Sequence, residues 1–249
     1  MVTESYDIET EAVIGLQDFY GERKHLIDVC LIIFSDEIYE HLLDTFECEE
    51  IARLKICNGD VPIYKLDYKG KDVAFYLSAV GSAVASSLCY ECSWITGASK
   101  FIMFGSCGSL DGEVTRGKYI IPTESYRGEG ASYYYAPASD YIKIKNSDKL
   151  VSIFEDMKIP YVQGKVWSTD SMVRETKGLC AKRRAEGCIA VEMELAGVQA
   201  ICDFYGMELY DFLEPGDVLA DSGYEVEGLS AANNSFGKAY IGLNVATRL

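Results

Sequence analysis

Two glutamates separated by one residue stand where an apolar strand is expected to run into a helix. Glu192 and Glu194 lie in the stretch 189–198, among apolar neighbours such as Val191 and Met193. One interpretation is an acidic helix N-terminus, which the helix dipole favours. Because apolar residues flank the pair, we expect at least one carboxylate to point into a pocket. A buried carboxylate can accept two hydrogen bonds from a vicinal diol, as in a ribose site.

A glycine-rich turn is the second segment that could do chemistry. The apolar stretch 100–104 runs directly into Gly105, Ser106 and Gly108. Glycines let the backbone approach a ligand closely, and N–H groups with a serine hydroxyl can hold an anion or an attacking water. Glycines after strands also form ordinary tight turns, so this segment alone does not establish a site.

The third segment is the turn 167–175, which follows another apolar stretch. Trp167 could stack on a heterocyclic base, and its alternative is a tryptophan of the core or the rim. Asp170 could contact the base or fix the turn through bonds to the backbone. Arg174 ends the same turn and is a candidate anion ligand.

These segments need a scaffold in which strands and helices alternate. Short apolar runs predict strands over residues 29–34, 73–80, 100–104, 119–122, 161–167, 189–192 and 209–213. Longer amphipathic stretches predict helices over residues 36–46, 83–96, 147–156, 177–186, 194–205 and 230–245. With only 5 prolines and no linker-like stretch, the pattern predicts one α/β domain.

Composition excludes several classes of protein. The 249 residues carry 39 acidic and 23 basic side chains, a net charge of -16 that disfavours nucleic-acid binding. Apolar runs are far shorter than the roughly 20 residues of a membrane-spanning helix, and no secretion signal is expected at the start. The nine cysteines lie in apolar runs, as reduced thiols of a cytoplasmic protein would. His25 and His41 are not spaced with cysteines as zinc requires, so we expect no metal and no cofactor.

Together, the three segments resemble the landmarks of the type I nucleoside phosphorylase family, which includes purine nucleoside and uridine phosphorylases and related nucleosidases. The resemblance covers residues 28–249 and leaves 1–27 as an N-terminal extension of uncertain structure. It implies a single α/β domain whose central mixed, twisted sheet is flanked by helices on both faces. It also implies a homo-oligomer, either a dimer or a hexamer.

The resemblance assigns roles to individual residues. In the family, the second glutamate of Val-Glu-Met-Glu binds the ribose hydroxyls and the methionine packs on the sugar. These positions are Glu194 and Met193 here, with Glu192 beside them. The purine branch uses an aspartate further on to protonate the base, and the family spacing places it at Asp217, with Asp221 as the nearby alternative.

The phosphate ligands of the family are missing. Met103 stands where an arginine is expected, and the first strand-to-helix loop contains Asp36 and Glu37 instead of glycine and arginine. Arg127 and Arg174 are the candidate replacements. In the hydrolytic branch a glutamate of this loop activates water, and Glu37 lies one position from the aligned place.

The sequence therefore predicts cleavage of the N-glycosidic bond of a nucleoside. Family frequency favours phosphorolysis, which converts nucleoside and inorganic phosphate to base and pentose 1-phosphate. The missing arginines favour hydrolysis. A catalytically silent member that binds a nucleoside is the third alternative, and the residues leave purine and pyrimidine bases equally open.

Overall fold

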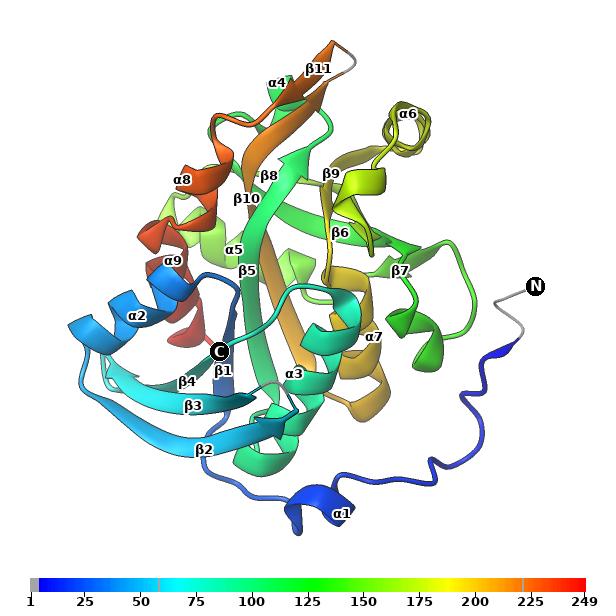
Figure 1. The fold of residues 1–249 in the computed structure, drawn as a ribbon. Helices are drawn as coiled ribbons and strands as arrows, with labels where there is room; N and C mark the ends of the chain where they lie inside the picture. The colour runs from blue at the N-terminus through cyan, green and yellow to red at the C-terminus, as the bar shows by residue number, and fades with distance from the viewer. Residues whose placement is uncertain (1–4, 58, 221) are drawn as a thin grey trace.

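Figure 1 shows the fold in a computed structural model that describes residues 5–57, 59–220 and 222–249. The strands are β1 (Val29–Ile33), β2 (Cys48–Ile56), β3 (Gly59–Tyr68), β4 (Lys71–Leu77), β5 (Lys100–Ser109), β6 (Tyr119–Gly128), β7 (Tyr141–Lys143), β8 (Tyr161–Thr169), β9 (Cys188–Glu192), β10 (Glu208–Ala220) and β11 (Gly223–Glu225). The helices are α1 (Gln17–Tyr20), α2 (Asp36–Thr45), α3 (Ser82–Thr96), α4 (Gly112–Thr115), α5 (Ser147–Met157), α6 (Lys177–Ala185), α7 (Leu195–Tyr205), α8 (Leu229–Asn233) and α9 (Phe236–Ala246). Two short 3-10 helices are η2 (Ala131–Tyr134) and η3 (Met172–Arg174).

The strands form one mixed sheet. Their order is β11-β10-β6-β8-β9-β5-β1-β4-β3-β2, with β7 beside β6. Strand β10 also pairs with β5, so β5, β10, β6, β8 and β9 close into a ring. The predicted class, an α/β fold with a mixed sheet and helices on both faces, is confirmed.

Each face of the sheet is covered by its own hydrophobic cluster. Helices α3 and α7 cover one face through residues such as Leu88, Leu195 and Val198. Helices α2, α5 and α9 cover the other through residues such as Leu42 and Phe154. A strand with helices on both faces must be apolar on both sides, and every residue of β1 is buried.

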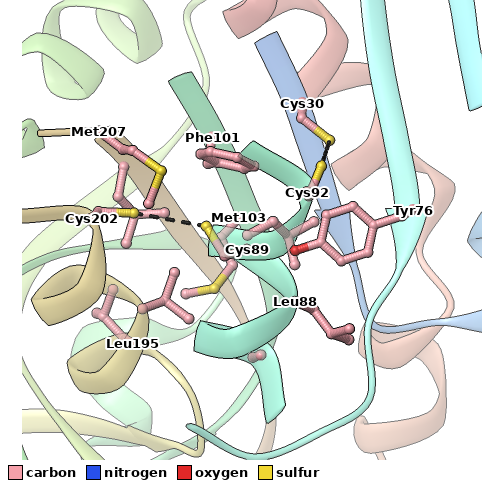
Figure 2. Packing of buried hydrophobic residues seen from close by; sticks show 14 of the residues in the cluster. Cys30, Tyr76, Leu88, Cys89, Cys92, Phe101, Met103, Leu195, Cys202 and Met207 are labelled. Carbon is pink, nitrogen blue, oxygen red and sulfur yellow. Dashed lines mark hydrogen bonds between the residues drawn. The ribbon is translucent and has the colours of Figure 1, made fainter. Parts of the chain in front are cut away.

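Four buried thiols lie in the core, on α3, α7 and β1, as Figure 2 shows. The sulfurs of Cys30 and Cys92 are 3.7 Å apart, and those of Cys89 and Cys202 are 3.9 Å apart. All nine cysteines are free. Burial raises the pKa of the Cys30 and Cys89 thiols, which keeps these thiols protonated as small apolar side chains.

The structure adds elements to the predicted ones and divides one of them. The hairpin β2–β3 and the short strands β7 and β11 were not predicted, because β11 is exposed throughout and β2 mixes exposed and half-buried residues without a continuous apolar run. The helix predicted over residues 230–245 is divided into α8 and α9. The break falls at Asn234 and Ser235, residues that favour helix ends over helix interiors.

Residues 5–27 run along the outside of the domain and contain α1 (Figure 1). The amide of Lys24 donates to the carbonyl of Trp94, and the amide of Leu26 donates to the carbonyl of Thr96 at the end of α3. The Tyr20 hydroxyl donates to Glu91 of the same helix at 2.5 Å. These contacts join the extension to α3 just before β1 begins.

Candidate active site

A cavity of about 510 Å³ opens where several strands end. Its size lies in the range of small-molecule sites in proteins. The predicted site residues that line it come from β5, β9, the start of α7 and β10: Gly105, Ser106, Gly108, Glu192, Met193, Glu194 and Asp217. Segments that lie more than a hundred residues apart in the chain therefore meet in one place.

The register of the ring of strands brings these residues together. Gly108 of β5 pairs with Asp217 of β10 on one side and with Val191 of β9 on the other. The register of β10 shifts between Pro215 and Asp217, which is a β-bulge. A Cβ atom at Gly108 would lie 2.5 Å from Cδ1 of Leu219 and 3.0 Å from Cγ1 of Val191, so a larger residue here would require these side chains to shift. This row of backbone fixes the position of Asp217 relative to the glutamates.

Glu192 is buried and holds the junction between β9 and α7. Its Oε2 accepts hydrogen bonds from the amides of Glu194 at 2.6 Å and Leu195 at 2.7 Å. Its Oε1 accepts from the Ser168 hydroxyl, which in turn accepts from the amide of Ala196 at 2.9 Å. Since both carboxylate oxygens are engaged by the protein, Glu192 positions the segment that begins α7 and carries Glu194.

Glu194 lines the cavity, and its carboxylate can accept further hydrogen bonds. Its Oε1 accepts from the amide of Gly81 at 2.6 Å, which joins the loop before α3 to this site. The Ser82 hydroxyl donates to the carbonyl of Met193 at 3.0 Å. Burial raises the pKa of Glu194 and of Glu192, and the charge of Glu194 raises the pKa of Glu192 further.

Burial of Glu192 predicts a pH dependence of stability. In the unfolded chain this group loses its proton near its ordinary pKa of 4.5, whereas the folded protein holds the proton to higher pH. The unfolded state therefore binds fewer protons above that value, and the free energy of unfolding falls as the pH rises. We expect a loss of about 1 to 3 kcal/mol between about pH 5 and about pH 8 from this group.

Urea denaturation of the wild type and of Glu192→Gln across this range measures the effect. The glutamine keeps an oxygen acceptor for the two amides but does not titrate, so its profile should be flatter than that of the wild type. Parallel profiles would show that Glu192 is ionised in the folded protein throughout.

At the opposite end of the cavity, Asp217 lies close to a second acid. Glu175, which follows η3, also lines the cavity. Burial and the charge of Asp217 raise the pKa of Glu175 to about 7, and burial raises the pKa of Asp217 as well. The Tyr224 hydroxyl of β11 hydrogen-bonds Asp217. A carboxyl group with a raised pKa can give a proton to a leaving group near neutral pH. The alternative, Asp221, lies outside the described residues.

Two serine hydroxyls, those of Ser35 and Ser106, line the cavity. Ser35 caps the N-terminus of α2 and donates to the side-chain oxygen of Asn234 at 2.9 Å. Ser106 donates to the side-chain oxygen of Asn233. Both asparagines come from the junction of α8 and α9, so this C-terminal segment covers the glycine turn.

A buried lysine also lines the cavity. Lys238 of α9 lines the cavity with its side chain 1% exposed, and its Nζ lies 3.7 Å from Glu214 and donates to the carbonyl of Ala232. Burial lowers the pKa of Lys238 to about 8. It is the one lysine or arginine that contacts the cavity in the described part of the chain.

The structure corrects both predicted base-binding residues. Trp167 is buried in a cluster with Leu110, Cys188 and Val191 and does not line the cavity. Its register partner on β9, Val191, belongs to the same cluster and also lines the cavity, so Val191 and not Trp167 presents surface to the site. Asp170 is exposed, and its Oδ2 accepts from the amide of Gly130 at 3.1 Å, which is the turn-fixing alternative.

The predicted anion ligands Arg127 and Arg174 also lie outside the cavity. Arg127 is 3% exposed, and its guanidinium donates to Ser132 at 2.8 Å and to the carbonyl of Pro137 at 2.6 Å. It stacks on Tyr133 at 4.0 Å, so it organises the loop after β6. Arg174 is exposed at the end of η3.

The predicted water-activating residue Glu37 is exposed and does not line the cavity, whereas its neighbour Asp36 does. Both lie in the first turn of α2, where successive residues point about 100° apart. Only one of the two can therefore face the site.

Four lining groups were missed by the sequence interpretation: Asp36, Glu175, Lys238 and the asparagine pair 233–234. Lys238 carried a signal, because it is the only charged residue between Phe236 and Ala246. The asparagines interrupt a stretch that otherwise reads as one helix. Glu175 and Asp36 carried none beyond lying near predicted site segments.

Within residues 5–57, 59–220 and 222–249, no group of three or more His, Cys, Asp or Glu is placed to hold a metal ion. No helix in those ranges has both the length and the apolar character to cross a bilayer.

Comparison with known proteins gives relatives in sequence and in structure. The chain is 26% identical over 163 residues to guanosine phosphorylase of Halorubrum lacusprofundi, which covers 64% of this chain and 66% of that protein. It is 26% identical over 186 residues to a DeoD-type purine nucleoside phosphorylase of Colwellia psychrerythraea, covering 72% and 76%. Futalosine hydrolase of Helicobacter pylori shares the fold, with a TM-score of 0.69, 17% identity, and coverage of 90% and 97%.

The chain thus spans about two thirds of the length of the first of these curated relatives. The family model of the phosphorylase superfamily matches residues 28–213, which include the glycine turn and the glutamate pair. The resemblance seen in the sequence is confirmed. The chain belongs to the phosphorylase superfamily.

Proposed function

We propose that this protein cleaves the N-glycosidic bond of a nucleoside by hydrolysis. The observation that carries the proposal is the acidic lining of the cavity. Five carboxyl groups, those of Asp36, Glu175, Glu192, Glu194 and Asp217, line the cavity. Departure of the base leaves positive charge on the ribose, and an ionised carboxylate stabilises this charge. An ionised carboxylate also repels a phosphate dianion, and a neutral carboxyl group offers a phosphate no positive charge.

In this proposal, separate residues bind the ribose and protonate the base. Glu194 accepts hydrogen bonds from the ribose hydroxyls, Met193 contacts the sugar, and Glu192 holds their segment through its three hydrogen bonds. Asp217 transfers a proton to the departing base as the bond to C1′ breaks and its electron pair moves onto the base nitrogen. The backbone row at Gly108 keeps this acid opposite the ribose-binding segment.

The nucleophile is a water molecule held between α2 and the glycine turn. Asp36 and Ser106 both line the cavity. The water oxygen attacks C1′, and its proton passes to the Asp36 carboxylate. The products are the free base and ribose.

Asp36→Asn is expected to lower the rate of nucleoside hydrolysis by about 10²-fold, because general-base catalysis contributes on that order. Glu37→Gln is the matched control, since it changes the neighbouring acid of the same helical turn outside the cavity. Release of free base from the substrate, measured for both variants and the wild type, checks the assignment. A larger loss of activity in Glu37→Gln than in Asp36→Asn would identify Glu37 as the general base.

Phosphorolysis is the second candidate function. It is favoured by the names of the curated relatives and by Lys238, whose ammonium group borders the cavity beside Ser106. Lysine can bind phosphate as a point charge. The pair with Glu214 and the hydrogen bond to Ala232 lower its availability, and for this reason we rank hydrolysis first.

Incubation with a panel of purine and pyrimidine nucleosides, with and without inorganic phosphate, tests the proposal. Free base and ribose in phosphate-free buffer support hydrolysis. A strict need for phosphate, with ribose 1-phosphate as product, would establish phosphorolysis instead. A nucleoside that raises the melting temperature without being cleaved would identify a silent binding protein.

A further inference from the structure

A second cavity of about 360 Å³ adjoins the first at the end that contains Asp217. The two cavities share three lining residues, which are Met172, Glu175 and Asp217. The two cavities therefore adjoin at these residues, with the proposed general acid at their boundary. The first cavity alone has a volume typical of a small-molecule site, so the second is additional room.

The walls of the second cavity come from η3, α6 and the end of β10. On one side lie η3 and α6 with Val173 and Cys180, and on the other lie Leu219 and Ala220 at the end of β10. These four side chains form an apolar part of the lining, in which Cys180 is buried and Val173 is 83% exposed. Tyr224 and Arg184 also line the cavity, and the Arg184 guanidinium donates to the carbonyl of Leu219 at 2.8 Å. Lys177 lies at the N-terminus of α6, on the rim.

The position of Asp217 sets the direction in which a bound base would extend. A base that receives a proton from Asp217 has its ribose in the first cavity, next to Glu194. The base edge opposite the ribose then faces the boundary between the two cavities. Glu175 lies at this boundary and can accept a hydrogen bond from an exocyclic N–H of the base.

We propose that the second cavity binds an apolar substituent carried by the base, so that the favoured substrates are nucleosides with an extended base. This inference rests on the proposed function, because it places the base at Asp217. The apolar walls favour an alkyl or aryl group, whose burial there removes apolar surface from water.

The test compares substrates with and without the substituent in variants that fill the second cavity. Val173→Trp and Ala220→Phe add bulk from opposite walls. Leu179→Trp and Val226→Phe are matched controls, because they add similar bulk to exposed positions of the adjoining segments that line neither cavity. The probes are adenosine with N6-benzyladenosine, and uridine with 5-benzyluridine. Both kcat/KM and the calorimetric Kd are measured for each.

The wild type is expected to bind and cleave the benzylated member of one pair at least as well as the parent nucleoside. Each filling variant should lower kcat/KM for that benzylated probe about tenfold or more, because a misfit of this size in a pocket is worth 1–3 kcal/mol. The parent nucleoside and both controls should change less than about twofold.

A wild type that prefers both parent nucleosides, or filling variants that affect parent and benzylated probes equally, would overturn the inference. Failure of the proposed function gives a different result. In that case no probe is cleaved, while selective binding of a benzylated probe and its loss in the filling variants still support the second cavity.

Discussion

Replacing Glu194 with alanine is expected to lower kcat/KM for ribonucleosides by about 10²- to 10⁴-fold. The alanine removes the carboxylate that would accept both ribose hydroxyls, and each hydrogen bond to a charged group is worth about 1.5 to 3 kcal/mol. The residue is largely buried beside Glu192 and faces the cavity. Its loss therefore leaves the ribose hydroxyls without their proposed acceptor. Steady-state kinetics with a ribonucleoside measures the effect.

Two controls separate ribose binding from a structural role. Glu194→Gln keeps one oxygen acceptor and should retain more activity than the alanine variant. A 2′-deoxynucleoside lacks one of the two hydroxyls, so alanine substitution should cost less with that substrate. Circular dichroism should be unchanged, although the Gly81 amide loses its acceptor. An equal loss on ribonucleoside and deoxynucleoside would contradict the assignment.

Asp217→Asn should slow the cleavage of natural nucleosides by about 10²- to 10⁴-fold, because an amide cannot deliver a proton to the departing base. Burial raises the pKa of Asp217, which favours the protonated form that can act as an acid. The rate should accordingly fall at high pH in the wild type, where Asp217 is ionised. The asparagine variant should lose this limb of the profile.

A substrate that needs no proton provides the discriminating measurement. A nitrophenyl riboside has an activated leaving group, so Asp217→Asn should affect its cleavage little. Tyr224→Phe is a companion variant, since it removes the hydroxyl that hydrogen-bonds Asp217 while keeping the ring. Its expected effect is a modest shift in the pH profile. Equal losses on both substrates in Asp217→Asn would favour a structural role for Asp217.

Local pattern carried much of what the sequence predicted correctly. The buried strands β1, β5 and β9 are short apolar runs, and such runs have few alternatives in an α/β chain. The glycine turn and the glutamate pair were recognised because each is a compact segment with its own chemistry. The structure brings Gly108 and Glu194 to one cavity through strand pairing.

Predictions that depended on side-chain direction did less well. Trp167 is adjacent in the chain to the turn 168–175, but its ring is buried in a cluster with Val191 and Cys188 and does not line the cavity. Asp36 and Glu37 are adjacent acids, and the angular step of the helix admits Asp36 to the cavity. The sequence analysis proposed Arg127 as an anion ligand. In the structure, its guanidinium donates to a hydroxyl and a carbonyl of its own loop instead.

By itself, the sequence determined the α/β class and the segments that hold the glutamate pair and the glycine turn. These depend on composition and on spacing within a few residues. Only the tertiary structure decided that Lys238 and the asparagines of residues 233–234 close the cavity, and that a second cavity lies beyond Asp217. The physical reason is that these features arise where β10 and α9 fold back over β5, and contacts between distant segments leave no local pattern.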